Sequence, residues 1–216
     1  MVRSVRDNDD SYAVRPTTVG GVEVPAGAEH PAVNVWAGTE LATPIGPLGV
    51  VVTGLGVLAV AFGGLAGAEE AARSLPGLVP GALPAQIDRV RAELADYFAG
   101  RLRAFTVPID WRLSGVGYAQ RVRSALYESV QYGEVISYGE LARQVGGAEV
   151  EGDFTAARAV GRAMATNPVP VIVPCHRVLA ADGSLHGFGG GLEMKRRLLA
   201  IEGAAPMTLD DVLALG

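Results

Sequence analysis

Apolar and polar positions change their spacing several times along this chain of 216 residues. Between Pro47 and Gly64, the segment PLGVVVTGLGVLAVAFGG contains two β-branched runs separated at Gly54 and Gly56. This pattern predicts a strand, a tight turn and a second strand. Residues 41–68 carry no charge and are long enough to cross a membrane as a helix. The two glycines argue against a continuous helix, so we expect no membrane contact.

A helical pattern follows the strand region. We expect short strands with Gly and Pro turns over residues 38–82, and then one helix in PAQIDRVRAELADYFAG that ends at Gly100. Its apolar stripe contains Ile87, Val90, Leu94, Tyr97 and Phe98. These elements predict an N-terminal α/β domain with a small antiparallel sheet over residues 38–108. Residues 1–37 show no sustained periodicity, which is typical of a flexible extension.

Helical spacing dominates the second half of the chain. After a link at VPIDWRLSG, one helix is predicted from Tyr118 to Val130, and another begins at Ser137, where SYGE fits a capping box. A third is predicted over 155–166, and the last lies in LEMKRRLLAIEG. Two short helices with small residues between them favour a helix-turn-helix, with an ordinary helical hairpin as the alternative.

Composition restricts the class of protein. Apolar residues make up 49% of the chain, which is enough to bury a core. The single cysteine excludes an internal disulfide and a CxxC site, so we expect no metal and a reducing, cytoplasmic environment. Residues 1–12 are charged and lack the apolar run of a secretory signal.

Charge is divided unevenly along the chain, whose net charge is −5. Residues 1–100 carry 6 basic and 11 acidic groups, whereas residues 101–216 carry 12 of each. The C-terminal half is therefore the better candidate for phosphate contact, and strong non-specific DNA affinity is not expected.

The only cysteine lies in VIVPCHRV, directly before His176. Prolines frame this segment as extended chain, in which the side chains of Cys175 and His176 point to opposite faces. Cooperation between them then needs a local bend or an intervening water. Taken alone, these residues favour a buried structural cysteine over a thiolate nucleophile. Glu202 changes that balance, because a carboxylate at a helix C-terminus favours a donor such as a histidine N–H, although a solvated Glu is the alternative.

Four motifs then carry a resemblance to a known family: NPVPVIVPCHRV, GEVISYGELA, AARAVGRAM and GFGGGLEMKRRLLAIEG. Over residues 114–204 the chain resembles the O6-alkylguanine-DNA alkyltransferase (methylated-DNA–protein-cysteine methyltransferase) family. A weaker likeness, in ATPIGPLGVVV and LADYFAG, extends into the N-terminal domain. The resemblance implies an α+β fold, with an RNase H-like N-terminal α/β domain, a mainly helical C-terminal domain bearing the helix-turn-helix, and a tail over 205–216.

The resemblance also implies a chemistry. Cys175 would accept the alkyl group irreversibly, in a single-turnover DNA repair reaction that needs no cofactor. His176 would take the thiol proton through water, and Glu202 would orient the imidazole. Asn167 would hold the active-site turn, and Tyr138 would crowd the target phosphate and donate to the guanine ring nitrogen.

The implied partner is double-stranded DNA that carries O6-alkylguanine, with O4-alkylthymine as a further substrate. Arg158 would fill the stack vacated by a flipped nucleotide, because chemistry on a base inside a duplex requires its extrusion. Small residues would let the helix approach the minor groove: Ala156, Ala157, Ala159 and Gly161. The base pocket would be lined by Met164, the Val178 carbonyl, Phe188, Gly189 and Gly190. The resemblance implies a monomer and leaves open whether it binds DNA cooperatively.

Three features depart from the family pattern. Arg123 stands where an aromatic-x-x-x-Val-Trp pattern has its Trp, which predicts lost packing or, alternatively, a surface cation near phosphate. Phe188 stands where the loop usually has Tyr, so the ring is kept and its hydroxyl is lost. The turn 146–154 is long and acidic, so beside phosphates it would project away from DNA or become ordered only on binding. A tolerated surface insertion is the favoured interpretation.

Two other functions fit part of this pattern. A non-catalytic alkyltransferase-like damage sensor would keep the wedge and the pocket without transfer, but the presence of Cys175 argues against it. A cysteine hydrolase or acyltransferase would also use Cys and His, but a neighbouring pair bridged by water is poor geometry for that chemistry.

Overall fold

The computed structural model describes residues 17–19, 22–24, 31–146 and 153–205 of the chain. It divides into two units, 1–30 and 31–216. In the first, β1 (Thr17–Val19) pairs antiparallel with β2 (Val22–Val24). The segment 1–37, predicted to be a flexible extension, therefore contains two short paired strands.

The second unit opens with a 3₁₀ turn, Pro31–Asn34, and a four-stranded sheet of order β5-β4-β3-β6. Its strands are β3 (Val35–Leu41), β4 (Leu48–Thr53), β5 (Gly56–Phe62) and β6 (Val79–Pro80). The strand–turn–strand prediction is confirmed for β4 and β5, which pair antiparallel. Two details differ: β6 runs parallel to β3, and β3 begins before the predicted domain boundary at residue 38.

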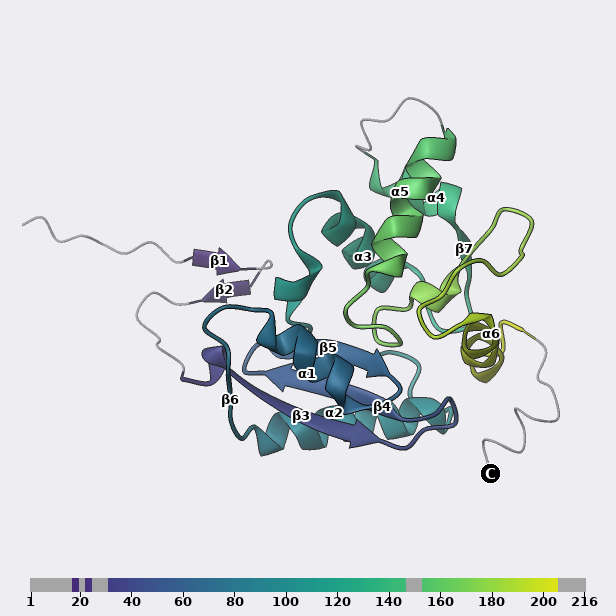
Figure 1. Ribbon diagram of the computed structural model, residues 1–216. Coiled ribbons are helices and arrows are strands. Elements are labelled where there is room, and N and C mark those ends of the chain that lie inside the picture. Colours follow the sequence, from purple (N-terminus) through teal and green to yellow (C-terminus); the bar gives the residue numbers. More distant parts are fainter. Residues whose placement is uncertain (1–16, 20–21, 25–30, 147–152, 206–216) are drawn as a thin grey trace, which may run out of the picture. The chain divides into compact units, whose positions relative to one another are not determined.

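Helices cover both faces of this sheet (Figure 1). The predicted helix is α2 (Pro84–Phe98), and its stripe packs with Val50, Val52 and Val57. The other face packs against α1 (Leu65–Arg73), which was not predicted, since this region was expected to form strands. Within the described residues, no helix is both long and apolar enough to span a membrane.

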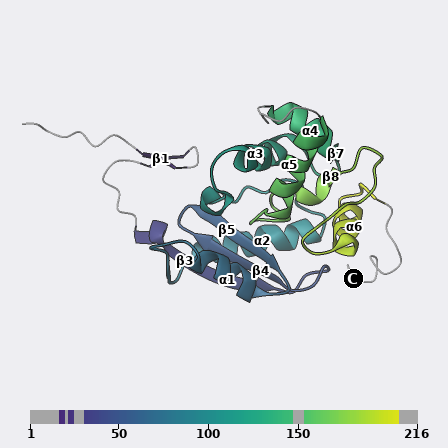
Figure 2. The same cartoon turned by 45° about the horizontal axis from the view of Figure 1, so that its top comes forward.

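The second half of the chain is mainly helical, as predicted (Figure 2). Its helices are α3 (Tyr118–Ser129), α4 (Tyr138–Val145), α5 (Asp153–Ala165) and α6 (Leu192–Ile201), with a 3₁₀ turn at Trp111–Ser114. The capping box before α4 is confirmed: the Ser137 hydroxyl accepts from the Glu140 amide, and the Glu140 carboxylate accepts from the Ser137 amide. Of the predicted acidic turn 146–154, Glu149 and Glu151 lie outside the described residues, whereas Asp153 is the first residue of α5.

A short parallel pair and a direct contact with the sheet place the cysteine segment. Strand β7 (Ile136–Ser137) pairs with β8 (Val178–Leu179), which follows the cysteine segment directly. The Val60 amide of β5 donates to the Pro168 carbonyl at 2.8 Å. One hydrophobic core contains residues of both predicted domains, 38–108 and 114–204, so the sheet and the helical half position the site together.

Candidate active site

The segment before Cys175 is a turn, not the extended chain expected from its prolines. The Val173 amide donates to the Val169 carbonyl at 2.9 Å, and Val171 lies at φ 74°. That left-handed conformation is strained for a β-branched residue, and such strain is found at functional sites. Residues Cys175–Arg177 then form one 3₁₀ turn. The local bend that a Cys–His pair requires is thus built into the backbone.

Asn167 fixes this turn and contacts the thiol. Its Nδ2 donates to the Val173 carbonyl at 2.9 Å and to Cys175 Sγ at 3.1 Å, and its Oδ1 accepts from the Val169 amide at 3.1 Å. One amide therefore satisfies backbone groups on both sides of the turn and points a donor at the sulfur. A donor at this position stabilises a thiolate relative to a thiol.

His176 lies against Glu202 in the interior. Its Nε2 is 2.8 Å from Glu202 Oε1, and both side chains are fully buried. Because the carboxylate can only accept, Nε2 carries the proton in this contact. His176 Nδ1 has no hydrogen-bond partner within the described part of the chain. Burial first, and then the charges of Arg177 and Lys195, lower the pKa of His176, while Glu202 raises it; the net direction is down, so the ring is neutral near pH 7 and Nδ1 is a free base.

Glu202 is the centre of a larger group, which we call the carboxylate network: Tyr97, His176, Arg177 and Glu202. The Tyr97 hydroxyl donates to Oε1 at 2.7 Å, and the Arg177 guanidinium donates to both oxygens at 2.8 and 3.0 Å. Burial raises the pKa of Glu202, but its bonds with His176 and Arg177 have the larger combined effect and lower the pKa from 4.5 to about 2. The carboxylate is therefore ionised and held rigidly at neutral pH.

Sequence reasoning did not assign Tyr97 and Arg177 to the site. Tyr97 lies on the predicted apolar stripe of α2, and its hydroxyl reaches Glu202 from 105 positions away in the chain. Arg177 directly follows His176 in the CHR motif, which is the local signal that could have identified it.

The thiol has an apolar environment with two cations nearby. Burial raises the pKa of Cys175, and the Asn167 amide with the charges of Lys195 and Arg123 lowers it again in part. Lys195 is fully buried on α6, and its Nζ donates to the Val178 carbonyl at 2.7 Å and the His186 carbonyl at 3.0 Å. It also lies 5.8 Å from the centre of the Tyr138 ring. Its place on the buried side of α6, three and four positions before Leu198 and Leu199, is a signal that sequence reasoning missed.

A pocket of about 600 Å³ opens beside this centre. Its lining includes Tyr138, Ala157, Arg158, Gly161, Phe188 and Gly189, all of them predicted for DNA or base contact. Three predicted pocket residues do not line it in the described structure. Met164 lies in the hydrophobic core, the Val178 carbonyl accepts from Lys195, and Gly190 packs so tightly that a Cβ there would lie 2.2 Å from Met194 Sδ.

The pocket loop rests on the N-terminal sheet. The ring of Phe188 lies 5.4 Å from the ring of Phe62, at the end of β5, with an interplanar angle of 50°. Aromatic pairs of this geometry contribute about 0.5–1.5 kcal/mol beyond the area they bury. Because Phe188 keeps its ring, this contact does not need the hydroxyl that the departure from Tyr removes.

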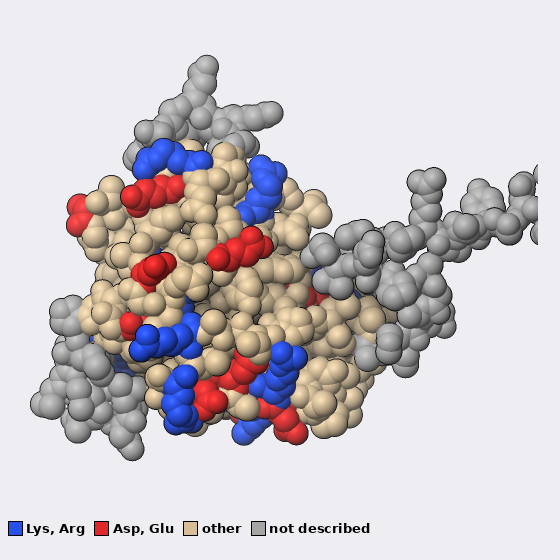
Figure 3. All heavy atoms as spheres, turned by 180° about the vertical axis from the view of Figure 1, so that it is seen from behind, with Lys and Arg blue, Asp and Glu red and all other residues tan. Residues whose placement is uncertain are grey.

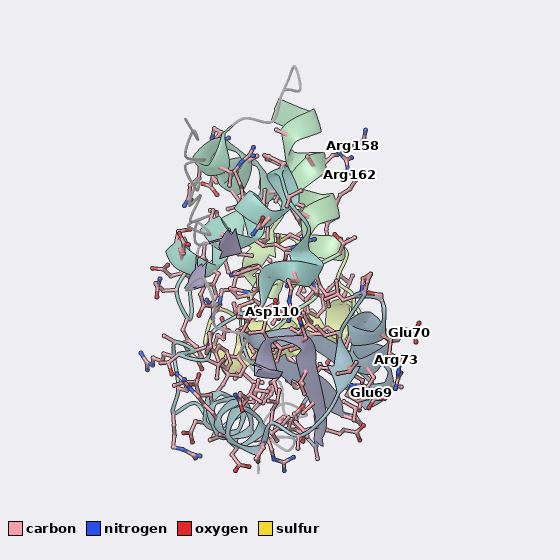
Figure 4. All side chains as sticks on the ribbon, turned by 90° about the vertical axis from the view of Figure 1, so that its left-hand side faces the viewer. Glu69, Glu70, Arg73, Asp110, Arg158 and Arg162 are labelled. Carbon is pink, nitrogen blue, oxygen red and sulfur yellow. The ribbon has the colours of Figure 1, made fainter. Side chains whose placement is uncertain are left out.

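The outer face of α5 combines small residues with two arginines. Arg158 and Arg162 are exposed and extend from the same side of the helix (Figure 4), whereas Ala156, Ala157, Ala159 and Gly161 are half-buried. On the face shown in Figure 3, basic and acidic side chains are interspersed. Small side chains and exposed arginines thus occur together on α5, which is the composition that the helix-turn-helix prediction assigned to it.

Arg123 has neither of its predicted environments. It is neither a surface cation nor a gap in the packing, since only 2% of it is exposed and its guanidinium donates four hydrogen bonds to neighbouring oxygens. The acceptors at the end of α5 explain why an arginine fits in the interior here.

The arrangement supports a cysteine nucleophile with a histidine base beside a pocket large enough for a nucleobase. No group of three or more His, Cys, Asp or Glu that could hold a metal ion exists among the described residues.

Comparison with known proteins gives the class of protein and then the family. A family model described as the DNA-binding domain of 6-O-methylguanine DNA methyltransferase matches residues 117–204. The methylated-DNA–protein-cysteine methyltransferase of Mycobacterium bovis is 42% identical over 177 residues, which cover 78% of this chain and 95% of that protein. The inducible one of Bacillus subtilis is 35% identical over 142 residues, 66% of this chain and 74% of that protein.

Solved structures agree with these relatives. The crystal structure of Mycobacterium tuberculosis OGT in complex with DNA matches with a TM-score of 0.63 and 37% identity, covering 83% of this chain and 98% of that one. The O6-methylguanine-DNA methyltransferase from Pyrococcus kodakaraensis matches with a TM-score of 0.53 and 26% identity over 78% and 99% of the two chains. The chain belongs to the O6-methylguanine-DNA methyltransferase family.

Proposed function

We propose that this protein repairs O6-alkylguanine in double-stranded DNA by moving the alkyl group to its own Cys175, once per molecule. The observation that carries this proposal is the set of buried hydrogen bonds at Cys175 and at the neighbouring His176. Asn167 donates to Sγ, and the neighbouring His176 is held by Glu202 with Nδ1 left as a base. Family membership supplies the substrate class.

The reaction follows from these groups. His176 Nδ1 takes the thiol proton through water, and the Asn167 amide stabilises the thiolate as it forms. Sγ attacks the O6-alkyl carbon in line, so an S–C bond forms while the C–O bond breaks. The bonding electrons pass to the guanine, whose ring nitrogen accepts a hydrogen bond from the Tyr138 hydroxyl as negative charge develops, and the proton taken by His176 returns to the guanine through water. Because a thioether is a poor leaving group, Cys175 stays alkylated and the protein acts once without a cofactor.

The pocket and α5 would bind the DNA. A flipped guanine would enter the pocket beside Tyr138, Phe188 and Gly189, after unstacking that costs a few kcal/mol. Arg158, which lines the same pocket, would take the place of the base in the stack. The half-buried small residues of α5 would allow close approach in the minor groove.

The environment of the thiol supports two further parts of the proposal. A lone reactive cysteine works only while it is reduced, which favours the cytoplasm. A damage sensor without transfer would need none of the contacts that surround Cys175, so the structure gives that alternative no support.

The experiment is intact-mass measurement after mixing the protein with a duplex that contains one O6-methylguanine. We expect the mass of one methyl group, mapped to Cys175, with saturation at one per protein. Cys175→Ala is the matched control, which should bind the same duplex and gain no mass. Binding without any gain by the unchanged protein would contradict the transfer and favour a damage sensor. Repeated turnover would contradict the single-use reaction.

A further inference from the structure

Arg123 of α3 is a buried cation without an acid partner among the described residues. Its Nε donates to the Ala163 carbonyl at 3.1 Å, and its Nη1 donates to the Ser114 carbonyl at 2.8 Å. Its Nη2 donates to the Thr166 carbonyl at 2.8 Å and to the Thr166 hydroxyl at 2.6 Å. All four acceptors are uncharged, so within the described residues no hydrogen bond of Arg123 reaches a carboxylate.

Two of these acceptors are carbonyls at the C-terminal end of α5. The last carbonyls of a helix lack partners within it and carry the negative end of its dipole, so a guanidinium fits there well. Arg123 therefore caps the helix that carries Arg158. Arg123 also donates to Ser114, in the link that precedes α3. One side chain therefore connects α3, the end of α5 and this link.

The capped end leads directly to the thiol. Thr166 holds two of the Arg123 bonds, and the next residue is Asn167, whose amide donates to Cys175 Sγ at 3.1 Å. A shift of the Thr166 backbone would move that amide away from the sulfur. The position of the donor thus depends on the guanidinium fork, because a planar fork fixes several acceptors at once.

The charge also acts on the thiol. Burial lowers the pKa of Arg123 and the Cys175 thiolate raises it, while the charge of Arg123 lowers the pKa of Cys175. The other groups around Cys175 are Lys195 of α6, Tyr138 of α4 and the carboxylate network. Glu202 within that network is already paired with Arg177. In the part of the chain that the structure describes, Arg123 and Lys195 are therefore the two positive charges near the sulfur that have no acid partner.

We propose that Arg123 is a positioning residue for the alkyl transfer: it holds the end of α5 so that Asn167 faces Cys175, and it supplies positive charge toward the thiolate. This inference rests on the proposed function for its role in transfer. Its effect on the thiol can be measured separately, without DNA.

The test compares Arg123→Met, which keeps the length of the side chain, with Arg123→Lys, which also keeps its charge. Iodoacetamide labelling of Cys175, followed by intact mass from about pH 6 to about pH 10, reports the thiolate fraction directly, because the chain has one cysteine. We expect Arg123→Met to raise the midpoint by about one pH unit and to slow labelling about tenfold at pH 7. Arg123→Lys should keep the midpoint but slow methyl transfer from DNA several-fold, because it loses the fork.

Thr166→Val provides a second variant if Arg123→Met does not fold, since it removes one acceptor and leaves the cation. We expect it to keep the labelling midpoint and to slow methyl transfer. An unchanged midpoint in folded Arg123→Met would overturn the role of the charge, and unchanged transfer in both Arg123→Lys and Thr166→Val would overturn the role in positioning. If the unchanged protein labels normally but takes no methyl from DNA, the proposed function fails, and the labelling midpoints still decide the charge.

Discussion

The two sides of Cys175 differ in how firmly their side chains are held. On one side, the carboxylate network is buried, and each of its four members makes a charged or charge-assisted hydrogen bond. On the other, the pocket wall, which we define as Tyr138, Arg158, Phe188 and Gly189, is partly or wholly exposed. Proton transfer needs groups fixed before the substrate arrives, whereas a flipped base needs a surface that can admit it. The difference indicates a rigid reacting centre behind an accessible binding face.

Glu202→Gln is expected to have the largest effect, because it leaves Arg177 buried without its charge partner. Removing one member of a buried ion pair costs about 3–5 kcal/mol of unfolding free energy. The amide also stops fixing the tautomer of His176, so methyl transfer should slow at least about a hundredfold. Urea unfolding and the intact-mass assay measure the two effects.

Glu193→Gln is the matched control on the same helix. The pKa of Glu193 also lies at about 2, held there by Arg196 and Arg197, but this carboxylate is exposed. Surface pairs are screened by solvent and contribute little. Equal losses of stability in the two variants would show that burial is not what separates the network from the surface.

Acid should weaken the same network by protonation. Burial first, with the Arg177 and Lys195 charges, lowers the pKa of His176 below 6.5, and the pKa of Glu202 falls from 4.5 to about 2. Both shifts mean that the unfolded chain binds more protons, so stability is full above pH 6.5 and declines as pH falls. We expect Glu202 to account for up to about 3 kcal/mol, lost between pH 4.5 and 2. Urea unfolding across this range should show that the stability of Glu202→Gln does not make this further fall between pH 4.5 and 2.

On the pocket wall, Arg158→Ala should slow DNA repair. We expect transfer from a subsaturating duplex to slow about tenfold, and transfer from the free base O6-methylguanine to stay unchanged, because no stack needs filling there. Arg162→Ala, one turn along α5 and outside the pocket lining, should only reduce the salt dependence of binding by about one phosphate contact. If Arg158→Ala also reacts more slowly with the free base, Arg158 acts in the alkyl-transfer step and not by filling the base stack of the duplex.

Much of the fold follows from local pattern, and the exceptions have physical causes. The capping box and the stripe of α2 are local signals, and both are confirmed. Helix α1 was missed because the residues that it buries completely are two alanines, Ala68 and Ala72. Alanine contrasts weakly with its neighbours, so its helical spacing does not stand out among glycines and short apolar runs.

For the site, the motif around Cys175 indicated the reacting residues but not what holds them. The contact between Tyr97 and Glu202 depends on the packing of α2 against the C-terminal segment, which no local spacing encodes. The place of Arg123 depends on carbonyls at the end of another helix, so its burial could not be inferred from its own surroundings in the chain.

The hydrogen bond between Tyr97 and Glu202 joins two residues that the ribosome adds at very different times. At about 5–20 residues per second, Tyr97 is made roughly 5–20 s before Glu202, 105 positions later. Until α6 docks with Glu202 at its end, His176 lacks the carboxylate that fixes its tautomer. A growing chain, or one cut before α6, therefore carries a cysteine that is present but not yet activated.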